Sequence, residues 1–241
     1  MKKHILSLLL LVAPALAFAN VGGPHLEKAN IDIHDQASLQ RGAKLFMNYC
    51  LSCHSAKFQR YNRMAQDLGL TEEEVTKNLM FITDKIGDTM NIAMPAADAE
   101  KWFGVIPPDL SVITRARGVD YIYTYLKGFY ADPKRPFGVN NVVFPDVGMP
   151  HVLWKLQGLQ KAEFVEHEGQ KVFEKFEPAE GGSLSAEEYD GVARDLTNFL
   201  TYVGEPIQAE RQRLGKWVLM FLAVFFVLAY LLKKEYWKDV H

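Results

Sequence analysis

Two cysteines and a histidine lie together near residue 50, and their spacing suits the binding of a metal cofactor. The segment reads Cys50-Leu51-Ser52-Cys53-His54, and it holds the only two cysteines of the 241-residue chain. In a C-x-x-C-H pattern each thiol can add to one vinyl group of a porphyrin, and the adjacent imidazole then falls under the iron as its proximal ligand. The spacing therefore predicts one covalently attached haem c, bound through Cys50 and Cys53, with His54 as an iron ligand.

Other uses of this cysteine pair fit the sequence less well. A dithiol redox pair follows a strand of a βαβ unit, and no such pattern precedes Cys50. A structural zinc site needs a second closely spaced pair of ligands, but the remaining histidines are scattered singly along the chain. A disulfide across two intervening residues would be strained. Haem attachment is the favoured interpretation.

A haem iron has a sixth position, and several residues are candidates for it. Two Met-Pro pairs, Met94-Pro95 and Met149-Pro150, stand in loop-like sequence, and His151 lies two residues beyond Met149. A methionine ligand raises the reduction potential and suits electron transfer, whereas an open position suits the binding of a small ligand. The residue types alone leave Met94, Met149 and His151 as alternatives.

The N-terminal segment predicts export. Lys2 and Lys3 precede an apolar stretch over 5–18 that is too short to span a bilayer, and Ala17-Phe18-Ala19 matches a cleavage signal. We therefore predict a signal peptide over 1–19 rather than an uncleaved anchor. Export agrees with the haem motif, because bacterial c-type haems are attached outside the cytoplasmic membrane.

The C-terminal segment predicts one membrane anchor. Trp217–Leu232 is a run of sixteen uncharged residues, which a helix would extend over about 24 Å. Extension back to Leu214 brings the length to about 28 Å, close to the thickness of the hydrocarbon core. A buried core helix would have a polar face, and this segment has none. The sequence thus predicts a single-pass transmembrane segment over 211–234 and a cytoplasmic tail over 235–241.

The segment 20–210 carries most of the acidic residues. It contains 19 basic and 27 acidic side chains, a net charge of −8, whereas the whole chain has a net charge of −2. Its length suffices for one hydrophobic core. The negative charge argues against nucleic-acid binding and favours a basic protein partner. We predict a single periplasmic domain over 20–210, on the outer side of a bacterial inner membrane.

Helix signals dominate the sequence between the two ends. Capping and periodicity predict a helix from Asp35 or Ser38 into the haem motif, one from Thr71 to Ile82, short ones over 111–118 and 121–126, and one from Ser185 to Gly204, with Pro206 opening the anchor helix. Short strands are expected over 165–167 and 172–173. The predicted fold class is mainly α: a cytochrome c-like haem domain with irregular loops and a short β element, plus one C-terminal transmembrane helix.

Three further segments carry a resemblance to a known family. They are 107–111 (PPDLS), 115–117 (RAR) and 144–150 (FPDVGMP), and they accompany the haem motif and the single C-terminal anchor. In this combination the chain strongly resembles the cytochrome c1 family, the haem subunits of ubiquinol–cytochrome c reductase (cytochrome bc1) complexes, in its compact proteobacterial form. The likeness extends from about residue 40 to residue 238.

The resemblance implies roles for four residues. Met149, in the Gly-Met-Pro loop, corresponds to the distal iron ligand, so the metal ligands would be His54 and Met149. Arg117 corresponds to an arginine near a haem propionate, which is physically sensible because a buried carboxylate requires a charged donor. Pro108 and Tyr121 correspond to walls of the haem pocket.

The resemblance also implies an electron-transfer function without a catalytic residue in this chain. As a subunit of an oxidoreductase of the respiratory chain, it would take electrons from a Rieske iron–sulfur protein, beside cytochrome b, and pass them to a soluble or tethered cytochrome c. Two alternatives are another membrane-anchored monohaem cytochrome, such as an oxidase-associated subunit or tethered shuttle, and a ligand-binding haem sensor. A sensor would bind CO readily in the ferrous state, whereas a methionine-ligated carrier would resist it.

Overall fold

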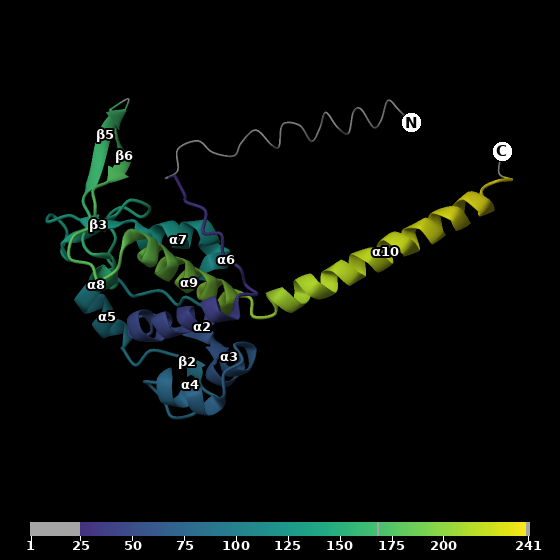
Figure 1. Cartoon of the computed structure of the whole chain (residues 1–241), viewed down its shortest axis with the longest axis horizontal. Helices are drawn as coiled ribbons and strands as arrows, with labels where there is room; N and C mark the ends of the chain where they lie inside the picture. The colour runs from purple at the N-terminus through teal and green to yellow at the C-terminus, as the bar shows by residue number, and fades with distance from the viewer. Residues whose placement is uncertain (1–24, 168, 240–241) are drawn as a thin grey trace.

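The computed structural model describes residues 25–167 and 169–239, so the predicted signal peptide over 1–19 lies outside the described residues. Helices form most of the regular structure, three two-stranded sheets lie among them, and one long helix projects from the body (Figure 1). The elements follow in this order: α2 (Gln36–Leu45), the π-helical segment η2 (Phe46–Cys50), β1 (Ala56–Arg60), α3 (Tyr61–Asp67), α4 (Glu72–Asn78), β2 (Thr89–Met90), α5 (Ala96–Phe103), α6 (Ile113–Arg117), α7 (Val119–Lys127), β3 (Phe129–Ala131), β4 (Val139–Asn141), α8 (Trp154–Gln157), β5 (Ala162–His167), β6 (Gln170–Phe176), α9 (Ala186–Gly204) and α10 (Gln208–Tyr236). The predicted mainly α fold class is confirmed.

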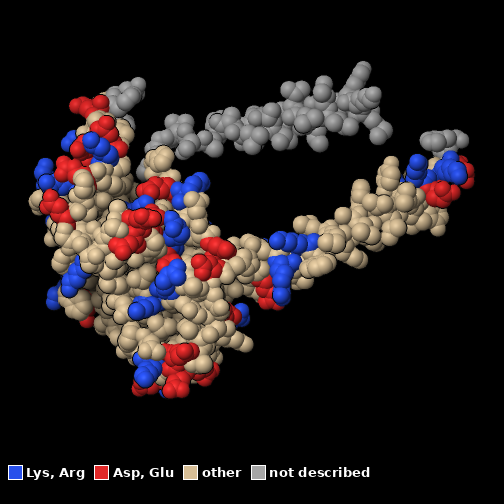
Figure 2. All heavy atoms as spheres, in the orientation of Figure 1, with Lys and Arg blue, Asp and Glu red and all other residues tan. Residues whose placement is uncertain are grey.

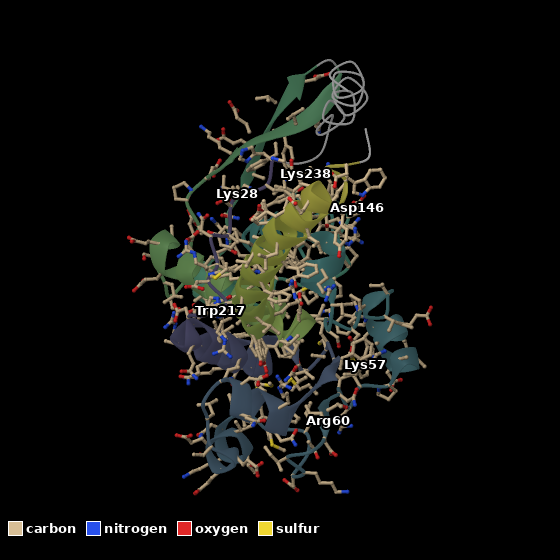
Figure 3. The ribbon with its side chains drawn as sticks, turned by 90° about the vertical axis from the view of Figure 1, so that its right-hand side faces the viewer. Lys28, Lys57, Arg60, Asp146, Trp217 and Lys238 are labelled. Carbon is tan, nitrogen blue, oxygen red and sulfur yellow. The ribbon has the colours of Figure 1, made fainter. Side chains whose placement is uncertain are left out.

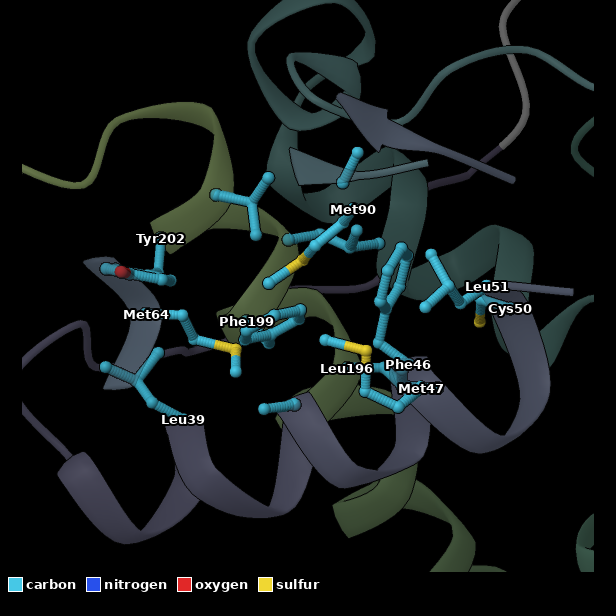
Figure 4. Packing of buried hydrophobic residues seen from close by; sticks show 14 of the residues in the cluster. Leu39, Phe46, Met47, Cys50, Leu51, Met64, Met90, Leu196, Phe199 and Tyr202 are labelled. Carbon is cyan, nitrogen blue, oxygen red and sulfur yellow. The ribbon is translucent and has the colours of Figure 1, made fainter. Parts of the chain in front are cut away.

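The core of the domain forms where α2 and α9 pack side by side (Figure 1). Phe46 and Phe199 lie with ring centroids 5.6 Å apart, and both are fully buried. Met64 and Met90 fill the space beside them, and Cys50 lies at the edge of the same cluster (Figure 4). Packing of helices from the two ends of the domain thus places the first cysteine of the haem motif against a rigid core.

The described residues form three antiparallel pairs of strands. β1 pairs with β2, and β3 pairs with β4 through Phe129–Asn141, Tyr130–Asn140 and Ala131–Val139. β5 and β6 form the hairpin that projects from the domain (Figure 1). The strands predicted over 165–167 and 172–173 are confirmed within this longer hairpin. The pairs β1–β2 and β3–β4 were not predicted. β1 has five residues but does not alternate between buried and exposed positions, and β2, β3 and β4 have only two or three residues each.

The predicted helix starts are confirmed at three places. Asp35 caps α2, because its side-chain oxygen accepts a hydrogen bond from the Ser38 amide. Of the two predicted capping residues, Asp35 and Ser38, the structure therefore shows Asp35. Thr71 with Glu74, and Ser185 with Glu188, form the two predicted capping boxes. At each of these sites a local side-chain oxygen satisfies a free amide of the first helical turn, so the signal is legible in the sequence.

Three predicted boundaries are wrong. The helix after Thr71 ends at Asn78 and does not reach Ile82, because Leu79 and Met80 turn into the core. Val112 rather than Ser111 precedes α6, because the Ser111 hydroxyl accepts instead from the Phe58 amide. Pro206 lies in a turn, and the anchor helix begins at Gln208.

The last helix has the properties of a membrane span. α10 has 29 residues and a mean hydropathy of 2.2 in its most apolar window, and it buries no residue against the rest of the described chain. At 1.5 Å per residue it is about 44 Å long, enough for the hydrocarbon core and part of both headgroup regions. Basic side chains gather at both ends with an uncharged stretch between them (Figure 2). The uncharged stretch begins at Trp217, and Lys238 lies two residues beyond the end of α10; both are labelled in Figure 3.

Candidate haem site

The haem motif lies at the end of the first core helix, in a compact turn. After α2 the helix widens into η2, in which the Leu51 amide donates to the Phe46 carbonyl at 3.0 Å. The amides of Cys53 and His54 then both donate to the Cys50 carbonyl, at 3.1 and 2.9 Å. This turn brings the two cysteines and the histidine to one end of the helix. Cys50 and His54 are buried, and Cys53 is half-buried.

The His54 ring is oriented by a backbone carbonyl. Its Nδ1 lies 2.7 Å from the Pro108 oxygen. A neutral imidazole that donates from Nδ1 has its lone pair on Nε2, which leaves Nε2 available to a metal. Burial lowers the pKa of His54, and the hydrogen bond to the Pro108 carbonyl acts in the opposite direction. These surroundings favour a neutral imidazole, the form that a metal ligand requires.

The PPDLS segment holds that carbonyl in place. The Leu110 amide donates to the Ser55 carbonyl at 2.7 Å, directly after the haem motif. An Asp109 carboxylate oxygen accepts from the Lys57 amide at 3.1 Å, and the Ser111 hydroxyl accepts from the Phe58 amide at 3.1 Å. These three bonds join 109–111 to 55–58. Pro108 was predicted only as a pocket wall, and the structure adds that its backbone oxygen orients His54.

A largely apolar cavity of about 400 Å³ opens beside this turn. Six of the predicted site residues line it, namely Cys50, His54, Pro108, Arg117, Tyr121 and Met149. The rest of its wall is mainly aliphatic and aromatic, from Val105, Ile106, Leu110, Ile113, Ile122, Tyr125, Leu126, Phe144, Val147, Leu196 and Leu200. A smaller cavity of about 80 Å³ shares His54, Pro108 and Met149 and is also lined by Cys53. All seven predicted site residues therefore border the same region.

Among the three candidates for the sixth ligand, the structure brings only one to this region. Met149 lines both cavities together with His54. Met94 precedes α5 and lines neither cavity. His151 is buried against Phe129, with stacked rings whose centroids are 4.9 Å apart, and it also lines neither. Met149 is thus the candidate that shares both cavities with the histidine.

The loop that carries Met149 is fastened to β4. The Asn140 side-chain oxygen accepts from the Asp146 amide at 2.9 Å, and the Asn141 side-chain oxygen accepts from the amides of Val143 and Phe144 at 2.9 and 3.3 Å. Asp146 has a left-handed backbone with φ of 61°, and its carboxylate pairs with Arg135 at 2.9 Å (Figure 3). Sequence reasoning missed both asparagines, whose roles depend on strand pairing.

The side chains of the two arginines of the RAR segment have different surroundings. Arg115 faces Glu205, at 3.8 Å. Arg117 lines the large cavity, with its guanidinium carbon 5.8 Å from the centre of the Tyr121 ring. Within 25–167 and 169–239, no carboxylate forms an ion pair with Arg117. A cation at the border of an apolar cavity suits the carboxylates of a bound group.

These residues fit a covalently bound haem. Two thiols stand at the required spacing, an imidazole presents a free Nε2, a thioether faces the same cavity, and the wall is apolar with one cation at its border. The buried Cys50 thiol has its pKa raised to about 12 by burial. Before the haem is attached, Cys50 would therefore be a neutral thiol at the edge of the core.

Comparison with known proteins agrees with this site. Residues 27–240 match the model of the Cytochrome C1 family. The chain belongs to the cytochrome c1 family. It is 58% identical to cytochrome c1 of Allochromatium vinosum over the full length of both chains. It is 48% identical to a protein named ammonia monooxygenase gamma subunit from Nitrosomonas europaea, covering 98% of this chain and 97% of that one. It is 28% identical to cytochrome c1 of Rhodospirillum rubrum, covering 93% and 92%.

Membership of the cytochrome c1 family establishes the cofactor and the class of function. The cofactor is covalently attached haem c. The chain is a membrane-anchored electron carrier of a respiratory chain, the haem subunit of a cytochrome bc1 complex, and it forms part of an oxidoreductase. The predicted family, cofactor and electron-transport role are confirmed.

Proposed function

We propose that this subunit takes electrons from a Rieske iron–sulfur protein beside cytochrome b and passes them to a soluble or tethered cytochrome c. The observation that carries the proposal is the placement of His54, oriented by the Pro108 carbonyl, on the same cavity as Met149. This pairing of donors suits a six-coordinate carrier, whereas an open position would suit a ligand sensor. When bound, the haem supplies a one-electron iron couple.

The protein's own residues hold and surround the cofactor in this proposal. Cys50 and Cys53 form the thioether links, and His54 and Met149 are the iron ligands. Arg117 pairs with a propionate, because a carboxylate near an apolar cavity requires a charged donor. Pro108 and Tyr121 complete the wall. No side chain is required to act as an acid, a base or a nucleophile.

The partners would meet the protein where the cavity reaches its surface. Val105, Ile106 and Phe144 line the large cavity, yet they are 49%, 50% and 45% exposed. An exposed apolar border of this kind suits brief contacts with more than one partner. The domain's net negative charge would attract a basic cytochrome c, and acidic side chains gather over α4, at Glu72–Glu74 (Figure 2).

We further propose the membrane arrangement predicted from the sequence. A signal peptide over 1–19 would place the domain over 20–210 in the periplasm, with the anchor over 211–234 and a cytoplasmic tail over 235–241. The length and apolar surface of α10 support a single span of the bacterial inner membrane.

The iron ligand is tested by the near-infrared spectrum of the purified complex. Met149→Leu should abolish the methionine–iron charge-transfer band, because leucine has no donor atom. Met94→Leu is the matched control and should retain the band, because Met94 lines neither cavity. Survival of the band in Met149→Leu would show that another residue is the iron ligand and would overturn this part of the proposal.

The direction of electron flow is tested by rapid kinetics. After quinol is mixed with the intact complex, this haem should be reduced only when the Rieske protein is present, and it should then reduce a basic cytochrome c. The second step should slow as the ionic strength rises, because salt screens the attraction between the partners. Reduction of the haem without the Rieske protein would exclude the proposed donor, and a rate independent of salt would exclude electrostatic docking.

A further inference from the structure

Tyr125 contacts the sulfur of Met149. The phenol oxygen lies 3.4 Å from Met149 Sδ, within the range for a hydrogen bond in which the hydroxyl donates to a thioether. Tyr125 lines the large cavity from α7, four residues after Tyr121. No sequence motif marks this tyrosine, and the predicted set of site residues does not include it.

Both groups of this contact are held by their surroundings. The Tyr125 ring packs edge-on against Phe129 at 5.2 Å and is stacked with Tyr121 at 6.4 Å. The Tyr125 carbonyl accepts from the Asn141 side chain at 2.8 Å, and Asn141 also binds the loop that leads to Met149. A contact held from both sides restricts the movement of the hydroxyl relative to the sulfur.

We propose that Tyr125 is a positioning residue that raises the reduction potential of the haem through the sulfur of Met149. The inference rests on the proposed function of Met149 as an iron ligand. A hydroxyl that donates to the sulfur withdraws electron density from it, so the sulfur donates less to the iron. The ferric state depends more on that donation than the ferrous state does, and the hydrogen bond therefore favours the reduced form.

The test is a redox titration and a near-infrared spectrum of the intact complex that carries Tyr125→Phe. This substitution keeps the ring and its packing and removes only the hydroxyl. We expect the charge-transfer band to remain but shift in wavelength. We expect the equilibrium to move about threefold to tenfold toward the oxidised haem, a fall of about 30 to 60 mV.

Tyr130→Phe is the matched control, because Tyr130 packs against Phe164 and lines neither cavity. It should leave both the potential and the band unchanged. An unchanged or higher potential in Tyr125→Phe would overturn the inference. Loss of the band in Tyr125→Phe would also overturn the inference. The hydroxyl would then be required for Met149 to bind the iron, rather than for adjusting the reduction potential.

Met149→Leu separates this inference from the function on which it rests. If the band survives in Met149→Leu, Met149 is not the ligand and the proposed ligation fails. If that band is lost while Tyr125→Phe behaves like the wild type, the ligation stands and only the role of Tyr125 is rejected.

Discussion

Asn141 connects two segments that both reach the haem cavity. Its side chain donates to the Tyr125 carbonyl at 2.8 Å and accepts from the amides of Val143 and Phe144, and the residue is 1% exposed. One buried side-chain amide therefore satisfies three backbone groups in or beside the loop. This side chain therefore helps to fix the position of the loop that leads to Met149.

We predict that Asn141→Ala destabilises both the fold and the ligation. The buried backbone groups would lose their partners, which should lower the free energy of unfolding by about 1–3 kcal/mol. The methionine–iron band should weaken or be lost at lower temperature than in the wild type. Denaturant unfolding and a temperature series of near-infrared spectra measure the two effects. Asn78→Ala, which removes an exposed side chain bonded to the Glu74 carbonyl, should change neither; equal effects of both variants would contradict the prediction.

At the scale of elements, the crossing of α2 and α9 depends on a glycine. A methyl group on Gly42 would lie 2.1 Å from the Asp195 carbonyl oxygen and 2.6 Å from Phe199 Cβ. Such separations are far below van der Waals contact, and the obstructing atoms are the backbone of α9 and the β-carbon of the buried Phe199. The close approach of the two helices therefore requires glycine at this position.

We predict that Gly42→Ala lowers the free energy of unfolding by about 1–3 kcal/mol through forced separation of the helices. This loss exceeds the gain of about 0.5–1 kcal/mol that alanine gives in a helix. Gly191→Ala on α9 is the control, because its methyl group would meet no atom within 4 Å and should stabilise the protein slightly. Denaturant unfolding of both variants checks this. Stabilisation by Gly42→Ala would show that the helices separate without cost.

Asp190 links α9 to α7, the helix that carries Tyr121 and Tyr125. It accepts from Lys127 at 2.8 Å and also binds Tyr123 and Arg194. Burial alone would raise the pKa of Asp190, but these partners outweigh burial and hold the pKa below its ordinary value. A depressed pKa in the folded state stabilises the fold above the unfolded value, and this contribution is lost as the pH falls through the folded pKa.

We predict that Asp190→Asn lowers the free energy of unfolding at pH 7 by about 1–3 kcal/mol. The difference from the wild type should shrink below about pH 4, where the carboxylate of the unfolded wild type is protonated. Thermal unfolding followed by circular dichroism between pH 3 and 7 gives both values. Asp84→Asn, at an exposed position, should have little effect. A difference of the same size at pH 3 and pH 7 would exclude the ionic explanation.

At the scale of the whole molecule, the anchor and the haem domain are energetically separate. α10 contributes no buried residue to the described structure, and its contacts to the domain include the exposed pair Arg211–Glu205 at 2.6 Å. Exposed pairs of this kind are worth about 0–1 kcal/mol. The core over α2 and α9 is complete without the anchor.

We predict that a chain ending at residue 207 folds as a water-soluble haem protein. Its melting temperature should lie within a few degrees of that of the full chain in detergent, since only exposed contacts are removed. The charge-transfer band should be retained. Circular dichroism and the near-infrared spectrum of the exported product measure both. Aggregation or loss of the band would show that α10 supports the domain.

Several features of this protein can be read from its sequence because they depend on residues close together in the chain. The haem motif, the capping boxes at Thr71 and Ser185, and the anchor over 211–234 are patterns of this local kind. The family resemblance adds Met149 and Arg117, whose positions in the fold are set by other segments. Two predicted boundaries, Ile82 and Pro206, were wrong: burial of Leu79 and Met80 ended one helix early, and Pro206 lies in a turn before the other begins.

The sequence by itself determined that this is a membrane-anchored haem protein and predicted its export, because covalent attachment and membrane insertion depend on spacing and hydropathy within short segments. Only the tertiary structure decided how the proposed iron ligands are oriented. The contact between His54 and Pro108 spans a sequence separation of 54 residues, and the contact between Met149 and Tyr125 spans 24 residues. Such contacts form when separate helices and loops pack on one core, and no local pattern along the chain records which groups will then meet.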